Sequence, residues 1–231
     1  MSQIKINLNQ IRDRMSRAAL RVGRDPDDVR LVAVSKKIPP DLINEAFTYG
    51  QTVFGENYLQ EAALKIEQLP PGINWHFIGH LQSNKAALAA SMFDIVETVD
   101  RLKVARALDR SLEDRGKGGL PILVQVNIGL EPQKSGVMPG EIAGLLLDLQ
   151  MLKNIQVQGL MVMPPFSSDA EEVRPYFRQT RELAFSLRDQ GLLATEGKIE
   201  LSMGMSNDYE AAIEEGSTLV RVGTALFGQR L

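Results

Sequence analysis

The stretch Leu31-Val32-Ala33-Val34-Ser35-Lys36 decides the fold of this chain. Its run of Leu, Val and Ala carries no interleaved charge, which is typical of a strand covered on both faces of a parallel sheet. A lysine at the end of such a strand is seldom buried without a partner, and the carboxyl ends of parallel strands are where α/β folds bind ligands. Lys36 is therefore a candidate functional residue. The alternative is a side chain that simply reaches solvent.

The rest of the chain alternates strands with helices. Apolar runs predict strands over residues 30–35, 52–54, 75–79, 94–98, 121–127, 155–161, 199–202 and 218–222. Helical spacing of apolar residues predicts helices over 40–49, 57–68, 83–91, 101–115, 139–151, 169–190 and 207–215. This alternation predicts an α/β fold in which one closed (β/α)8 TIM barrel uses residues 1–231 as a single domain.

An additional amphipathic helix is expected before the barrel. Ile4, Leu8, Ile11 and Met15 mark one helical face, and the helix should end near Gly23. The segment has no apolar core or cleavage pattern of a targeting signal. Because no stretch approaches the ~20 apolar residues of a membrane span, we expect a cytoplasmic protein without a membrane partner.

The composition excludes several classes of function. Hydrophobic residues make up 44% of the 231 residues, and the net charge of -3 gives no electrostatic reason to bind nucleic acid. The absence of cysteine excludes disulfides and thiolate chemistry. The only histidines are His76 and His80, and a strand over 75–79 does not favour a shared zinc site, so we expect no bound metal.

Polar residues follow the ends of the predicted strands. In a barrel these ends share one face, where active sites are built. Each residue alone could be an ordinary helix cap, as Ser206 or Asn207 could be for the helix that follows. The positions concerned are Lys36, Glu56, Asn57, His80, Asp100, Asn127, Met163, Met203, Ser206, Arg221, Gly223 and Thr224.

Two of these segments suit a phosphate group. The segment 204–206 (Gly-Met-Ser) and the pair Gly223-Thr224 combine glycines, which let backbone N–H groups approach an anion, with hydroxyl donors. Barrels often bind phosphate at the loops after strands seven and eight. In a closed barrel strand eight lies ~4.8 Å from strand one, so Lys36 would lie beside that phosphate. A phosphate-bearing aldehyde such as pyridoxal 5'-phosphate, held as a Schiff base, would reach both.

These residues carry a family resemblance over nearly the whole chain. The chain resembles the YggS/PROSC family of pyridoxal-phosphate-binding proteins. The motifs are 31–36, Phe54-Gly55-Glu56-Asn57, Trp75-His76-Phe77-Ile78-Gly79-His80-Leu81-Gln82-Ser83-Asn84-Lys85, Leu201-Ser202-Met203-Gly204-Met205-Ser206 followed by Asp208, and Arg221-Val222-Gly223-Thr224-Ala225-Leu226-Phe227-Gly228.

The resemblance implies a single barrel of the alanine-racemase N-terminal type with pyridoxal 5'-phosphate as cofactor. It implies that Lys36 forms the Schiff base and that Arg221 lies against the pyridine nitrogen. It further implies that Asn57 contacts the cofactor and that the phosphate is held by Ser206, Gly223 and Thr224.

Three further residues stay open at this stage. His80 is a candidate either for a cofactor-site residue on the rim or for an acid/base, and Met203 for packing against the cofactor ring or the core. Lys37 competes with Lys36, since successive residues of a strand point to opposite sides and periodicity cannot choose within an apolar run.

The resemblance implies a role in vitamin B6 and amino-acid homeostasis. We expect a monomer that holds pyridoxal phosphate without robust catalysis and supplies it to apo pyridoxal-phosphate enzymes. The first alternative is a pyridoxal-phosphate-dependent amino-acid racemase or related small enzyme. The second, which sets the resemblance aside, is a phosphosugar enzyme with a Schiff-base lysine.

Overall fold

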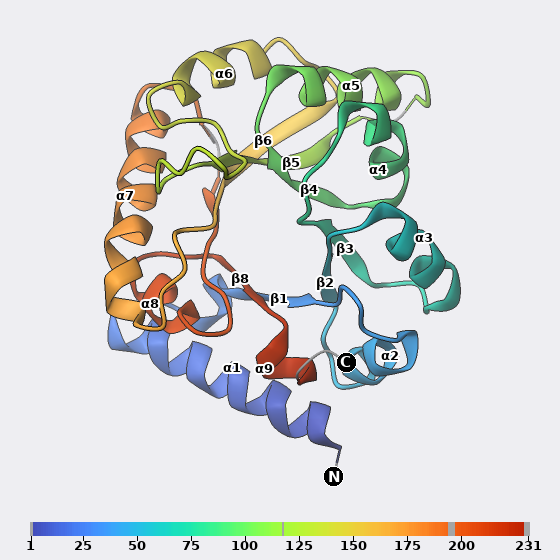
Figure 1. The fold of residues 1–231 in the computed structure, drawn as a ribbon, viewed down its shortest axis with the longest axis vertical. Coiled ribbons are helices and arrows are strands. Elements are labelled where there is room, and N and C mark those ends of the chain that lie inside the picture. Colours follow the sequence, from blue (N-terminus) through green and yellow to red (C-terminus); the bar gives the residue numbers. More distant parts are fainter. Residues whose placement is uncertain (1, 117, 194–196, 229–231) are drawn as a thin grey trace.

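Eight parallel strands close into a barrel in the computed structural model, which describes residues 2–116, 118–193 and 197–228 (Figure 1). Each strand pairs with the next in sequence, and β8 pairs with β1. This confirms the predicted α/β barrel. The strands are β1 (Arg30–Val34), β2 (Val53–Glu56), β3 (Asn74–Phe77), β4 (Ile95–Val99), β5 (Leu120–Val126), β6 (Ile155–Val162), β7 (Glu200–Ser202) and β8 (Leu219–Val222).

Helices cover the outside of the barrel (Figure 1). Within the described residues they are α1 (Gln3–Arg21), α2 (Pro40–Thr48), α3 (Leu59–Gln68), α4 (Ala86–Met92), α5 (Leu102–Glu113), α6 (Ile142–Leu149), α7 (Ala170–Asp189), α8 (Tyr209–Glu214) and α9 (Thr224–Phe227), with short 3-10 turns η1 (Pro26–Asp28) and η2 (Ser83–Lys85). None of these helices is both long enough and apolar enough to cross a bilayer.

The additional helix at the start of the chain forms as expected. The Ser2 hydroxyl caps α1 by accepting the backbone N–H of Ile4 at 3.2 Å, and the apolar face with Leu8 and Ile11 is buried. The helix ends two residues before Gly23, whose φ of 70° is left-handed. In Figure 1, α1 runs along the outside of the barrel beside α8 and α9.

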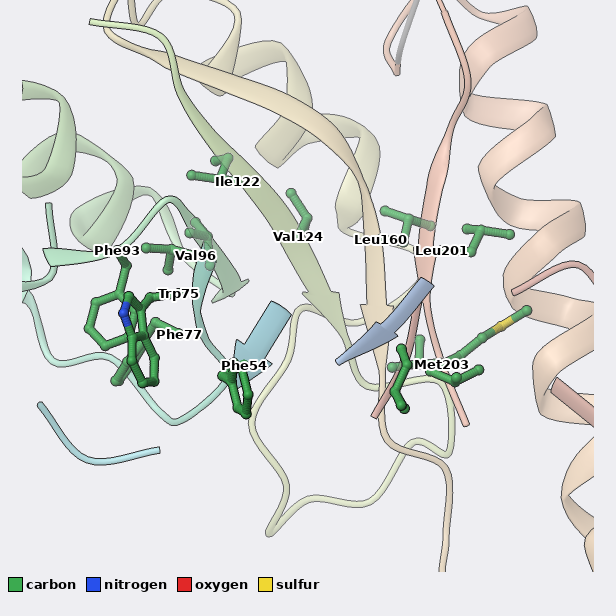
Figure 2. Packing of buried hydrophobic residues seen from close by; sticks show 14 of the residues in the cluster. Phe54, Trp75, Phe77, Phe93, Val96, Ile122, Val124, Leu160, Leu201 and Met203 are labelled. Carbon is green, nitrogen blue, oxygen red and sulfur yellow. The ribbon is translucent and has the colours of Figure 1, made fainter. Parts of the chain in front are cut away.

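Alternate positions of the strands build two apolar clusters. The larger one fills the space between barrel and helices and includes the aromatic residues Phe54, Trp75, Phe77 and Phe93 (Figure 2). The smaller one fills the barrel interior with Val32, Ile95, Leu123, Met161 and Leu219. The interior is therefore packed, and a ligand has room only at an end of the barrel.

Closure of the barrel brings the two ends of the sequence together. Val32 of β1 is in register with Arg221 of β8, and Ala33 with Val222. The segment after β1, which carries Lys36, therefore leaves the sheet next to the segment after β8, which carries Gly223 and Thr224. This neighbourhood matches the expectation from the sequence.

Candidate functional site

A cavity of about 310 Å³ lies at the carboxyl end of the barrel. Its size falls at the lower end of the ~300–1,000 Å³ that is typical of small-molecule sites. The described residues that line it come from strands β1, β2, β3, β6, β7 and β8 and the loops that follow them. They are Val34, Lys36, Asn57, Ile78, Met163, Pro165, Phe166, Ser167, Met205, Ser206, Asn207, Asp208, Arg221, Gly223 and Thr224.

Lys36 and Lys37 have different surroundings because a turn follows β1. The strand ends at Val34, so the alternation of a strand no longer governs the two lysines. Lys37 has a left-handed φ of 60° and is exposed to solvent, whereas Lys36 is partly buried and lines the cavity. Of these two lysines, Lys36 is therefore the one placed to meet a ligand.

Two hydroxyls meet on the side of the cavity formed by the loops after β7 and β8. The Thr224 hydroxyl donates to the Ser206 hydroxyl at 3.2 Å. Gly204 has a left-handed φ of 93°, and a Cβ there would lie 2.6 Å from the Ala212 Cβ. The glycine thus lets the loop pass closely over α8 and sets the position of Ser206.

Asn57 presents a buried oxygen that lacks a partner. Its side chain lines the cavity, and its Oδ1 accepts no hydrogen bond from the described part of the chain. The backbone at Asn57 is held close to Gly79, where a Cβ would lie 2.1 Å from the Asn57 carbonyl oxygen. An unpaired buried acceptor costs about 1–3 kcal/mol, so this oxygen is suited to accept a hydrogen bond from a ligand.

Arg221 is the cation at the floor of the cavity. It is 4% exposed, and it donates to the Ser202 hydroxyl at 2.6 Å and to the Val162 carbonyl at 2.8 Å. The Ser202 hydroxyl donates to Glu97 at 2.5 Å, and Glu97 in turn lies 2.5 Å from Nδ1 of His76. A chain of polar side chains therefore crosses the barrel interior beneath the cavity.

These hydrogen-bonded side chains partly compensate the positive charge of Arg221. Burial lowers the pKa of Arg221 below its usual value, and the negative charges of Glu97 and Asp208 offset part of that effect. Burial raises the pKa of Glu97, but the hydrogen bond to His76 and the charge of Arg221 outweigh it, so that pKa lies below its usual range. Glu97 is therefore a buried carboxylate that stabilises a buried guanidinium.

Six of the eight residues predicted for the site line this cavity. They are Lys36, Asn57, Ser206, Arg221, Gly223 and Thr224. The other two lie outside its lining. His80 is exposed, with its Nδ1 3.2 Å from the Ser135 hydroxyl, and Met203 is fully buried in the larger apolar cluster (Figure 2). Met203 directly follows the short strand β7 and extends its outward-facing pattern into the core.

Other rim residues have local roles. The N-cap of α8 is Asp208, so neither Ser206 nor Asn207 takes the cap position that we considered. The Asn127 side chain holds the loop after β5 by donating to the Glu131 carbonyl at 2.8 Å. Asp100 pairs with the neighbouring Arg101 at 2.5 Å.

Several residues of the site were not predicted from the sequence. Pro165, Phe166 and Ser167 line the cavity from the loop after β6, and Phe166 is 81% exposed. The only signal for this loop was its place after a predicted strand. The contact between His76 and Glu97 also had no signal, because the two residues meet only when β3 and β4 lie next to each other in the barrel.

Comparisons with known proteins agree on one family. Residues 6–231 match the family described as alanine racemase, N-terminal domain. The chain is 43% identical over 238 residues to the pyridoxal phosphate homeostasis protein of Escherichia coli, covering 100% of this chain and 98% of that protein. Identity to the protein of the same name in Aquifex aeolicus is 39% over 226 residues, with 96% of each chain covered.

Solved structures give the same result. PipY from Synechococcus elongatus, solved with PLP bound, has a TM-score of 0.82 and 40% identity, covering 94% of this chain and 100% of that one. A D-threonine aldolase from Filomicrobium marinum has a TM-score of 0.77 at 18% identity, covering 97% of this chain and 60% of that one, which shows a shared fold alone. The chain belongs to the pyridoxal phosphate homeostasis protein family and has the barrel fold of the alanine racemase N-terminal domain.

Proposed function

We propose that this chain binds pyridoxal 5'-phosphate in the cavity at the carboxyl end of the barrel and acts in pyridoxal phosphate homeostasis. The observation that carries the proposal is the meeting of a partly buried lysine, Lys36, with the paired hydroxyls of Ser206 and Thr224 in one cavity. PLP is bound in the solved structure of PipY, which is 40% identical to this chain.

The residues present fit this cofactor. Ser206 and Thr224 would hold the phosphate, because hydroxyls donate well to an anion. Asn57 has a buried oxygen ready to accept a hydrogen bond, and Arg221 offers a fixed cation at the floor. When bound, the cofactor supplies an aldehyde that condenses with amines and a ring that withdraws electrons. Lys36 would be the amine that retains it.

We further propose that the chain is a monomeric, cytoplasmic carrier that supplies the cofactor to apo enzymes. Among the described residues that line the cavity, the ionisable side chains are Lys36, Asp208 and Arg221. Asp208 accepts the backbone N–H of Met205 at 2.5 Å, and burial raises its pKa. Apart from Lys36, this set offers poor support for proton transfer at a bound amino acid. The alternative racemase function rests on a shared fold alone.

Borohydride trapping tests the binding site. The purified protein is incubated with pyridoxal 5'-phosphate, reduced and digested, and the modified peptide is identified by mass spectrometry. We expect the pyridoxyl group on Lys36, its retention in Lys37→Ala and its loss in Lys36→Ala. A pyridoxyl group mapped to Lys37 or to another lysine would refute the assignment.

A further inference from the structure

Polar side chains outside the cavity hold the backbone just before Lys36. Ser35 is fully buried, and its hydroxyl donates to Glu56 Oε1 at 2.7 Å. The Ser35 carbonyl accepts from Lys65 Nζ at 2.6 Å. Lys65 also pairs with Glu56 Oε1 at 2.7 Å. Both the side chain and the carbonyl of Ser35 are thus fixed by one ion pair.

The backbone just after Lys36 is held by the same group of side chains. Glu61 Oε1 accepts the backbone N–H of Lys37 at 2.5 Å and pairs with Lys65 Nζ at 2.6 Å. Lys37 has a left-handed φ of 60°, an uncommon conformation for a residue other than glycine. The hydrogen bond from its N–H to a carboxylate compensates for that conformation, and it determines where the chain turns after Lys36.

Two neighbouring elements supply these side chains. Glu56 is the last residue of β2, whose Gly55 is in register with Val34 of β1. Glu61 and Lys65 lie four residues apart on α3 and therefore share a face of that helix. The helix that follows β2 thus reaches back over the end of β1.

The energetics of Glu56, Glu61 and Lys65 indicate that these residues fix the local geometry more than they add stability. Glu56 is 0% exposed and Lys65 is 5% exposed, so both charges have left water. A buried ion pair often adds little net stability compared with apolar residues of the same volume, because desolvation offsets the attraction. Lys65 uses its three N–H donors on Ser35, Glu56 and Glu61, and this fully used ammonium fixes one geometry, although Glu56 Oε2 finds no partner among the described residues.

We propose that Glu56, Glu61 and Lys65 form a positioning clamp that holds the two neighbours of Lys36, so that the Lys36 side chain enters the cofactor cavity. The inference rests on the proposed function and extends it to three residues that do not line the cavity. They act through the backbone on either side of Lys36 and not by direct contact with the cavity.

Glu61 is the best residue for the test, because its side chain is 28% exposed and its loss leaves the Glu56–Lys65 pair intact. Affinities for pyridoxal 5'-phosphate and for pyridoxamine 5'-phosphate, which has no aldehyde and cannot join a lysine, are measured by calorimetry. For Glu61→Ala we expect about tenfold weaker binding of the first ligand and unchanged binding of the second. Glu61→Gln, which keeps an acceptor oxygen, should recover part of the loss. Glu67→Ala, exposed on the same helix, is the matched control.

A double-mutant cycle shows whether Glu61 acts through Lys36. In a Lys36→Ala background, Glu61→Ala should cause no further loss of affinity. Amide hydrogen exchange in the peptide around residues 35–38, measured without ligand, should become faster in Glu61→Ala and stay unchanged in Glu67→Ala.

Three results would overturn the clamp: equal losses for both ligands, wild-type affinity in Glu61→Ala, or a further loss in the Lys36→Ala background. Wild-type protein that binds neither ligand would refute the proposed function, and the clamp's role with it. This result differs from a failure of the clamp alone, in which the wild-type protein binds both ligands and only the effect of the Glu61 variants departs from expectation.

Discussion

Ser206 and Thr224 are the residues through which phosphate recognition is tested most directly. Their hydroxyls lie 3.2 Å apart, one from the loop after β7 and one at the start of α9. Each charge-assisted hydrogen bond to an anion is worth about 1.5–3 kcal/mol. We expect the double variant Ser206→Ala/Thr224→Ala to bind pyridoxal 5'-phosphate at least tenfold more weakly, while unphosphorylated pyridoxal binds almost unchanged.

Equilibrium dialysis with both ligands measures this difference. Ser91→Ala, on α4 and away from the cavity, controls for the loss of a hydroxyl elsewhere. Equal weakening of the two ligands would mean that the phosphate is recognised by other residues.

Gly79 is a second residue whose replacement gives a defined result. A Cβ at this position would lie 2.1 Å from the Asn57 carbonyl oxygen, and a backbone atom cannot move away as a flexible side chain can. We expect Gly79→Ala to lower the free energy of unfolding by roughly 1–3 kcal/mol and to weaken cofactor binding through Asn57. Urea denaturation measures the first effect.

Gly144 supplies the matched control for that experiment. It is exposed within α6, and a Cβ there would meet no atom within 4 Å. Because alanine is favoured over glycine in a helix, Gly144→Ala should raise the free energy of unfolding by about 0.5–1 kcal/mol. Equal effects of the two substitutions would contradict the close approach at Gly79.

At the scale of elements, Glu215 joins α7 to the end of α8. This buried carboxylate lies 3.0 Å from Arg178, 3.3 Å from Arg181 and 3.6 Å from Arg174, three residues of α7. The hydrogen bond from Arg178 holds the pKa of Glu215 below its usual range, with further lowering by the charges of all three arginines and opposition from burial.

The sign of the pH dependence follows from this lowered pKa. A carboxyl with a lower pKa in the folded state stabilises the protein above its unfolded pKa of about 4.3 and loses that contribution as pH falls through the folded pKa. We expect Glu215→Gln to lower the free energy of unfolding by about 1–2 kcal/mol at neutral pH, and the difference from wild type to shrink in acid. Urea titrations from neutral pH to below about pH 4.3 measure the difference in free energy of unfolding between variant and wild type. Glu113→Gln is the exposed control. A difference that grows in acid would contradict the assignment.

The bounds of some strands and helices were predicted from the sequence more accurately than those of others. β6 and β8 were predicted within one residue, because β6 alternates apolar residues with glutamines before an apolar end and β8 is apolar except for Arg221. The second strand was expected over 52–54 and runs over Val53–Glu56, since Glu56 is polar and its buried partner Lys65 lies on another element. Helix α6 begins at Ile142 instead of 139, because Pro139 and Gly140 form a turn before it.

At the scale of the whole molecule, closure of the barrel decides what the sequence could reveal about the site. Lys36, Arg221 and Thr224 were predictable because each follows or ends an apolar strand, and closure joins the first strand to the last. The contact between Glu97 and Ser202 spans 105 residues of sequence and leaves no periodic signal. The turn that separates Lys36 from Lys37 depends on the Glu61 carboxylate of α3. The sequence around the two lysines gives no sign of this contact.

The lining of the cavity, to which the first and the last strand of the barrel contribute, also sets the expectation for catalysis. Among the described lining residues, the ionisable side chains besides Lys36 are Asp208 and Arg221, and Arg221 is held by Ser202 and Val162. The lack of a second general acid or base besides Lys36 typically costs about 10²–10⁴-fold in rate.

We therefore expect slow proton exchange at the Cα of amino acids and efficient transfer of the cofactor to other proteins. Holo protein is incubated with a panel of L-amino acids in deuterated water, and Cα deuterium is followed by NMR; incorporation should stay far below the turnover of ~1 s⁻¹ or more that ordinary enzymes show. In parallel, an apo pyridoxal-phosphate enzyme mixed with the holo protein should regain activity, whereas Lys36→Ala protein carried through the same loading and desalting should restore little. Rapid deuterium incorporation that disappears in Lys36→Ala would overturn the carrier role and favour the racemase, because only a protein that removes the Cα proton itself would produce it.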